Sequence, residues 1–151
     1  MRHCPVAGAL IFPGATVYKN SLGGAAVVFC GTPDTKFTYL EAFSFLNESR
    51  KAQLVSCLKE AGALPIYCES DNELCLRSGY TEDGHLLAMV LNLGFDPEES
   101  LTLYLEKTPE SIRLLLPDGS YKSIEARPLG DSLYELPVTA EPMYPVVLLI
   151  K

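Results

Sequence analysis

Residues 85–105, HLLAMVLNLGFDPEESLTLYL, decide the fold of this chain. Residues 86–93 form a continuous apolar run that only Asn92 interrupts, which is typical of a strand buried on both faces. Residues 101–105 alternate between leucine and a less apolar residue, as a strand buried on one face does. The Gly, Asp and Pro residues between these two segments predict a turn. The stretch therefore predicts two strands at the centre of an antiparallel sandwich.

The rest of the C-terminal half repeats this pattern of short strands separated by turn residues. The segments Pro117–Ser120 and Glu82–Gly84 both predict hairpin turns. Such a rhythm indicates an all-β sandwich or barrel. We expect the last strand to be central, because it is almost wholly apolar after Pro145. The predicted strands cover residues 74–78, 86–93, 100–105, 112–116, 121–126, 133–138 and 144–150.

The N-terminal part predicts a small α/β segment. Residues 6–12 indicate a strand, and residues 16–30 indicate a hairpin with a Gly-Gly turn. Residues 37–46 fit either a helix or an aromatic-rich loop packed on the core. A short strand at residues 65–67 fits a crossover from the second strand of the hairpin.

One helix is predicted, over residues 47–62. Asn47 is a suitable N-cap, and Gly62 is placed for the left-handed residue that ends many helices. Its apolar stripe contains Leu54, Val55 and Leu58.

These observations predict an α+β fold, mainly antiparallel β, with a C-terminal β-sandwich and one packed helix. We expect the small α/β segment to span residues 1–70 and the sandwich domain residues 71–151, packed as one unit. The expected core residues are Leu54, Val55, Leu58, Met89, Leu91 and Val147.

The composition excludes several classes of function. A net charge of −7, with no dense cluster of Lys or Arg, argues against partners such as nucleic acid or an anionic membrane. No apolar run reaches the roughly 18–20 residues of a membrane span. The five cysteines are odd in number and follow no disulfide or zinc spacing, so we expect reduced thiols in a cytoplasmic protein.

The sequence offers no convincing catalytic or metal site. Cys30 ends a strand, as some amidotransferase nucleophiles do, but only His3 and His85 are available to activate it, and a buried structural thiol is the simpler interpretation. The thiols Cys57, Cys68 and Cys75 lack zinc-ligand spacing. The acidic loop of Glu69, Asp71, Asn72 and Glu73 is better explained as solvated charge than as a calcium site. Nothing pairs the carboxylates Glu98, Glu99, Glu106 and Glu125 across a sugar. We expect no catalytic residue, metal or cofactor.

Carbohydrate binding would need exposed aromatic rings. The chain has eight Tyr but no Trp, the residue best suited to stacking on sugars. The candidate ligand-binding residues are Tyr80, Tyr104 and Tyr121.

A family resemblance is visible in residues 85–105, in IRLLLPDGSY at 112–121 and in LPVTAEPMYPVVLLI at 136–150. This region resembles the C-terminal β-domain that closes many multidomain bacterial glycoside hydrolases of the β-galactosidase type, with Asn92-Leu93, Asp118-Gly119 and Pro145 at the places of that family's pattern. Residues 17–31 and 46–67 are similar to the segment that joins this domain to an amidotransferase-like α/β domain.

The resemblance implies a non-catalytic accessory module that stabilises a glycoside hydrolase or its assembly. No catalytic residue carries over, and we expect the chain to be cut from a longer protein. The implied partners are the rest of the parent enzyme or a homo-oligomer partner, and the aromatic stretch Phe37–Phe45 is the expected interface. A carbohydrate-binding module and a small enzyme built on Cys30 are the alternatives.

Overall fold

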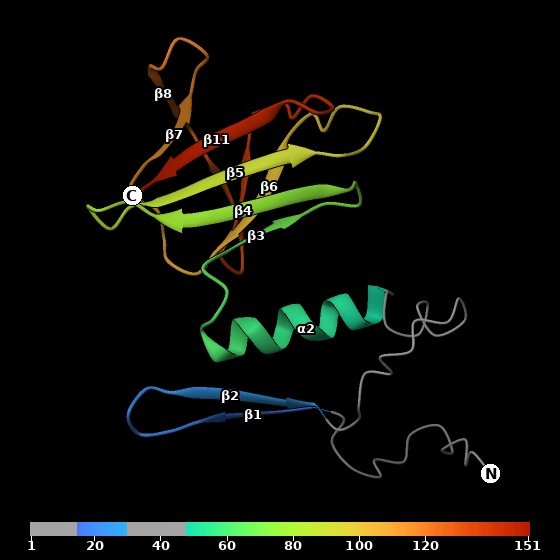
Figure 1. The fold of residues 1–151 in the computed structure, drawn as a ribbon, viewed down its shortest axis with the longest axis vertical. Helices are drawn as coiled ribbons and strands as arrows, with labels where there is room; N and C mark the ends of the chain where they lie inside the picture. Colours follow the sequence, from blue (N-terminus) through green and yellow to red (C-terminus); the bar gives the residue numbers. More distant parts are fainter. Residues whose placement is uncertain (1–14, 30–47) are drawn as a thin grey trace, which may run out of the picture. The chain divides into compact units, whose positions relative to one another are not determined.

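The computed structural model describes residues 15–29 and 48–151, which fall into two compact units, Met1–Leu64 and Pro65–Lys151 (Figure 1). The fold is α+β and mainly antiparallel β, as the sequence predicts. Several predictions lie outside the described residues: the strand at 6–12, the segment 37–46 with its expected interface, the cap Asn47, and the residues His3 and Cys30.

The first unit contains the predicted hairpin and the predicted helix. Strands β1 (Ala15–Lys19) and β2 (Ala25–Phe29) pair antiparallel, and Gly23 in the turn has a φ of +86°. Helix α2 spans Glu48–Ala61 and ends as predicted, because Gly62 has a φ of +66°. Two backbone bonds then close the helix end: Gly62 N–H donates to the Lys59 carbonyl, and Ala63 N–H donates to the Leu58 carbonyl, each at 3.0 Å.

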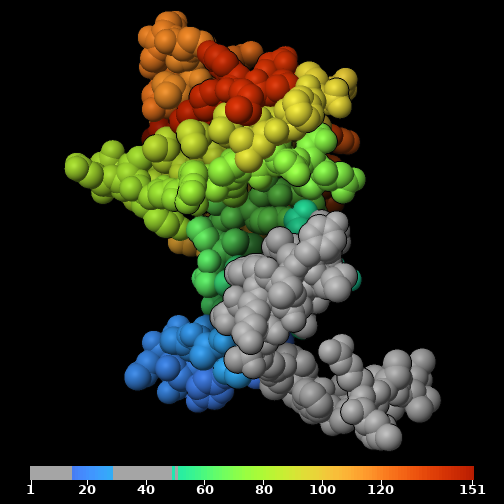
Figure 2. All heavy atoms as spheres, turned by 45° about the vertical axis from the view of Figure 1, so that its right-hand side comes forward, coloured from blue at the N-terminus to red at the C-terminus, as the bar shows by residue number. Residues whose placement is uncertain are grey.

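The second unit is a sandwich of two antiparallel sheets. The four-stranded sheet has the order β3 (Ile66–Glu69), β6 (Leu101–Leu105), β10 (Leu133–Leu136), β9 (Arg127–Gly130). The five-stranded sheet has the order β4 (Leu74–Tyr80), β5 (Leu86–Asn92), β11 (Pro145–Ile150), β7 (Ile112–Leu115), β8 (Tyr121–Ile124). Strand β11 is central and Pro145 begins it, as predicted. Both predicted turns close hairpins, β4–β5 and β7–β8, whose tips project from the body of the unit (Figures 1 and 2).

The two sheets share one aliphatic core. Strand β6 contributes three leucines that are at most 1% exposed, and the even-numbered residues of β5 and β11 face them. Full burial of one such side chain stabilises a fold by about 1.5–3 kcal/mol. The largest contributors to this core are Leu101, Leu103, Leu105, Leu136, Leu148 and Val90.

The residues predicted to form the core in β5 and β11 are the wrong ones, because their immediate neighbours along each strand face the core. Met89, Leu91 and Val147 are only partly buried and lie on the outer face of the five-stranded sheet. Since both faces of these strands are apolar, the sequence does not tell which face meets the other sheet. On the helix, Leu54 and Leu58 are 37% and 38% exposed, so that prediction is also wrong, whereas Val55 is partly buried. The described neighbour of α2 is a two-stranded hairpin, which covers less of a helix than a full sheet does.

The strand after the helix belongs to the sandwich. Strand β3 pairs antiparallel with β6, so the predicted crossover from residues 25–30 to this strand is wrong. The boundary between the units therefore falls between Leu64 and Pro65, whereas we expected it after residue 70. The short strand β9 was not predicted, because Pro128 and Gly130 in it are poor strand formers.

Asn92 is the one buried polar residue among the described residues, and all its side-chain polar atoms are used. Its Nδ2 donates to the carbonyls of Asp96 at 2.8 Å and Ala140 at 2.9 Å, and its Oδ1 accepts from Gly94 N–H at 2.8 Å. Asn92, which interrupts the apolar run, thus links the turn after β5 to the segment before β11 through hydrogen bonds.

Candidate functional site

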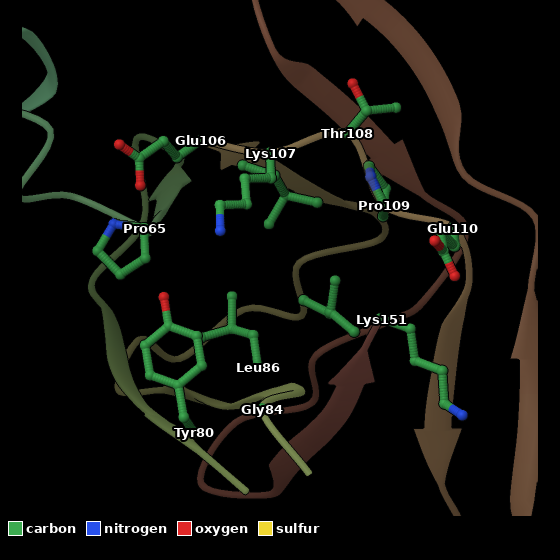
Figure 3. Close-up of a pocket in the computed structure, with 12 residues that line it drawn as sticks. Pro65, Tyr80, Gly84, Leu86, Glu106, Lys107, Thr108, Pro109, Glu110 and Lys151 are labelled. Carbon is green, nitrogen blue, oxygen red and sulfur yellow. The ribbon is translucent and has the colours of Figure 1, made fainter.

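A cavity of about 250 Å³ lies at one end of the sandwich (Figure 3). Its floor is the last layer of the core, formed by Leu86, Leu105 and Ile150. Its walls come from the β4–β5 hairpin and from the loop of residues 106–110 that follows β6. An apolar floor with polar walls suits a small organic ligand.

Backbone hydrogen bonds hold these walls in place. Glu106 N–H donates to the Pro65 carbonyl at 3.0 Å, and Glu110 N–H donates to the Lys151 carbonyl at 2.7 Å. On the opposite wall, Thr81 N–H donates to the His85 carbonyl at 2.9 Å and closes the hairpin. Both ends of the 106–110 loop are therefore fixed to the sandwich.

The polar side chains of the cavity come from both walls. The ends of the Tyr80 and Lys107 side chains face each other across the cavity, whereas Glu110 and Lys151 lie at its other end (Figure 3). Glu106 lies beside Pro65 at the rim. Tyr80 is 66% exposed, so most of its ring is open to solvent or to a ligand.

A second feature is an apolar stripe on the outer face of the five-stranded sheet, where β5 and β11 pair. Met89 lies opposite Val147, and Leu87 lies opposite Leu149. Leu87 is 39% exposed and Met89 is partly exposed, whereas Leu149 is only 8% exposed although it lies outside the cluster shared by the two sheets. We call this set the outer apolar stripe; its residues are Leu87, Met89, Leu91, Pro145, Val147 and Leu149.

The outer face of the four-stranded sheet has a different character. One cross-strand row contains Glu69, Thr102 and Glu135, and the Arg127 guanidinium pairs with the last of these. Arg127 Nε donates to Glu135 Oε2 at 2.7 Å. The neighbouring row on the same face contains Tyr67, Tyr104 and Leu133, so this face mixes charged residues with aromatic and aliphatic ones.

The three tyrosines predicted to bind a ligand do not form one surface. Tyr80 lines the end cavity. Tyr104 lies opposite Tyr67 on the outer face of the four-stranded sheet. Tyr121 lies on β8, with the Arg113 guanidinium carbon 5.1 Å from its ring centroid. Arg113 Nε is buried and has no hydrogen-bond partner among the described residues.

The cysteines of the second unit lie on different surfaces. Cys68 packs against the core from β3, and Cys75 lies opposite Leu91 on the outer face of the five-stranded sheet. Burial, together with the nearby Glu98 carboxylate, raises the pKa of the Cys68 thiol to about 12. Such a thiol stays protonated and unreactive at neutral pH.

The predicted acidic groups serve local structure. Glu98 Oε1 accepts a hydrogen bond from Ser70 Oγ at 3.1 Å, and the Asn72 side chain donates to its other oxygen. The loop of residues 69–73 is thereby tied to the turn before β6. Within residues 15–29 and 48–151, no three His, Cys, Asp or Glu side chains are grouped so as to hold a metal ion. In the same part of the chain, no helix has the length and apolarity needed to cross a membrane.

No family model, curated protein or solved structure matches this chain. Of the candidate ligand-binding residues only Tyr80 lines the cavity, and Lys107, Glu110 and Lys151, which also line it, were not candidates. The cavity brings together segments far apart in the chain, and no local pattern indicates that they meet.

Proposed function

We propose that this chain is a non-catalytic accessory module that docks onto a glycoside hydrolase and stabilises that enzyme or its assembly. The outer apolar stripe is the observation that carries the proposal. On the outer face of the five-stranded sheet, the paired strands β5 and β11 present only apolar side chains, whereas the flanking strands β4 and β7 present Arg77 and Arg113. Contiguous exposed apolar surface marks sites of protein association.

The composition of these two strands supports the same proposal. Strands buried on both faces are continuously apolar, and β5 reads LLAMVLN while β11 reads PVVLLI. Among the described residues of the second unit, the four-stranded sheet covers one face of these strands. A docked partner would cover the other face of β5 and β11. Both faces of these strands would then be buried, as their continuously apolar sequences predict.

We propose a glycoside hydrolase as the partner because residues 85–150 resemble the β-domain that closes such enzymes. We place the module in the cytoplasm, because Cys57, Cys68 and Cys75 are free thiols.

Site-specific photocrosslinking in the native host tests this proposal. A benzophenone amino acid replaces Leu87 in the outer apolar stripe, and the matched control replaces Thr102 on the outer face of the other sheet. We expect the first probe, and not the second, to link the chain to the catalytic part of a glycoside hydrolase, identified by mass spectrometry. Equal labelling from both positions, or products that contain no glycoside hydrolase sequence, would contradict the proposal.

A charge substitution provides a quantitative measurement of the same interface. Leu87 is 39% exposed, so Leu87→Glu should change the free energy of unfolding of the chain by less than about 1 kcal/mol. Placed in a docked interface, the unpaired carboxylate should weaken association by more than about tenfold. Thr102→Glu is the control and should leave association unchanged.

A further inference from the structure

We propose that the protein surface that docks on the outer apolar stripe is acidic as well as apolar, and that its carboxylates pair with Arg113 and Arg77 on the two sides of the stripe. This assignment rests on the docking role proposed above and adds the chemistry of the partner. The charges beside the stripe, the unpaired state of both arginines and the symmetry of a dimer support it.

Two arginines flank the outer apolar stripe. Arg77 on β4 lies opposite Met89, and Arg113 on β7 lies opposite Leu149, so both side chains leave the sheet on the same face as the stripe. Acidic residues outnumber Lys and Arg by 19 to 12 in the whole chain, yet none of the five strands of this sheet contains Asp or Glu. The acids Glu73 and Glu125 lie beyond the ends of β4 and β8. The outer face is therefore apolar at its centre and positively charged on both sides.

Neither arginine has a carboxylate partner within the described part of the chain. Arg113 is partly buried, and its Nε has no hydrogen-bond acceptor there, which destabilises a fold. Its guanidinium carbon lies 5.1 Å from the centroid of the Tyr121 ring, so the group is already held in place and loses little freedom on binding. On the other sheet, by contrast, Arg127 pairs with Glu135. A docked carboxylate would supply Arg113 with the acceptor that the chain itself lacks.

A second copy of the chain fits this face poorly. The two copies of a two-fold dimer use the same surface patch. Each copy would bring Arg77 and Arg113 to the contact, and like charges facing each other across an interface cost free energy. A partner with Asp or Glu beside its apolar residues has no such cost, and it gains from the two parallel hydrogen bonds that a guanidinium can donate to a carboxylate.

The sheet also sets the spacing of the two charges. Strands β5 and β11 lie between β4 and β7 (Figure 1), so three strand spacings, about 14 Å in total, separate the backbones at Arg77 and Arg113. The partner should therefore present two carboxylates at a comparable separation, with apolar side chains between them.

Photocrosslinking of the full chain from Leu87, in a lysate of the native host, tests this chemistry. Mass spectrometry sequences the partner peptide that the benzophenone probe links, and we expect this peptide to contain Asp or Glu among apolar residues. Raising the salt concentration from about 0.05 to 0.5 M should lower the yield severalfold, because salt screens ion pairs. Docking through apolar contacts alone would not weaken in this way.

Three charge variants identify the groups responsible. Arg113→Gln should lower the crosslinking yield about tenfold, and Arg77→Gln about threefold, because Arg77 is exposed and an exposed ion pair contributes less. Arg127→Gln is the control and should leave the yield unchanged, since its partner Glu135 lies on the other sheet. Urea unfolding of each variant separates lost docking from lost folding, and Arg77→Gln keeps the test decisive if Arg113→Gln does not fold.

A charge exchange then distinguishes an ion pair from a structural role of Arg113. Arg113→Glu should abolish the crosslink, and replacing the linked acid of the partner by arginine should restore it. Unchanged yields in both Arg113→Gln and Arg77→Gln would overturn the proposal. A linked peptide without acidic residues, a second copy as the sole product, or no product at all would do the same.

The identity of the linked protein tests the proposed function separately. A glycoside hydrolase whose crosslink is insensitive to both arginine variants would keep the proposed function and remove the acidic partner surface. Another protein, linked through an acidic peptide and lost in Arg113→Gln, would remove the proposed function and keep the acidic partner surface.

Discussion

Substitution of Asn92 by alanine should cost a large share of the stability of the sandwich. Asn92 is fully buried and makes three side-chain hydrogen bonds, with Gly94, Asp96 and Ala140. These bonds join the turn after β5 to the segment that leads into β11. Asn92→Ala removes all three and leaves a small cavity between the sheets.

The magnitude follows from the exposure of each partner. Ala140 is fully buried, but its carbonyl still accepts a hydrogen bond from Glu98 N–H at 3.1 Å, so loss of the Asn92 bond there costs about 0.5–1.5 kcal/mol. Gly94 and Asp96 are nearer to solvent, and each lost bond there costs about 0.5–1 kcal/mol. The total is about 1.5–3.5 kcal/mol, against the roughly 5–15 kcal/mol by which a domain of this kind is stable.

Urea unfolding of the full chain, followed by circular dichroism, measures the loss as a lower midpoint with an unchanged slope. Asn72→Ala is the matched control, because Asn72 is exposed and its side chain makes one hydrogen bond, to Glu98. It should cost about 1 kcal/mol or less. A loss of less than about 1 kcal/mol in Asn92→Ala would show that this network does not hold the two segments together.

Asn92→Asp tests the direction of the hydrogen bonds. The new carboxylate could still accept from Gly94 N–H, but it would face the carbonyl oxygens of Asp96 and Ala140 in a buried site. Burial and these dipoles should raise its pKa in the folded state above the value of about 3.9 in the unfolded chain. The variant should therefore lose stability, relative to wild type, as the pH rises from about 4 toward 7. No pH dependence of the difference would refute this geometry.

Two further predictions concern other positions. Because burial raises the pKa of Cys68 to about 12, iodoacetamide at pH 8 should label this thiol in urea but not in the native chain. The raised pKa should also make the folded chain less stable as the pH rises from 9.0 to about 12. Native labelling as fast as labelling in urea, measured by mass spectrometry, would contradict the first prediction. A Cβ added at Gly119 or at Gly79 would meet no atom within 4 Å, but only Gly119 has a left-handed backbone, with a φ of +83°. Gly119→Ala should therefore cost about 1 kcal/mol of stability, and Gly79→Ala should not. Equal urea midpoints for the two variants would refute the role of the left-handed turn.

Much of the fold was predictable because local chemistry determines it. The turns at Gly84 and Gly119 have positive φ angles, and the helix ends at Gly62 for the same reason. Seven strands of the sandwich lie within two residues of their predicted bounds, since alternation and turn residues mark them. Strand β3 was assigned to the wrong sheet because its partner β6 lies more than 30 residues away, and a strand of four residues does not specify its partner.

The end cavity was beyond such reasoning. Tyr80 was a candidate because exposed tyrosines are visible in a sequence, but Tyr104 and Tyr121 seemed equal to it. What distinguishes Tyr80 is its position at an open end of the sandwich, where a loop between β6 and β7 reaches it. That position depends on how the sheets stack, and no spacing in the chain encodes it.

The error in the predicted core is itself informative. Met89, Leu91 and Val147 were expected inside because their strands are apolar throughout, and the structure places them on the outer face. On the other sheet, the outer positions of β6 and β10 hold Thr102 and Glu135 in one row and Tyr104 and Leu133 in the next, whereas every outer position of β5 and β11 is apolar. If these residues are buried in the working protein, the covering surface must come from outside the second unit. The outer apolar stripe is therefore where we expect solvent protection to increase when the partner binds.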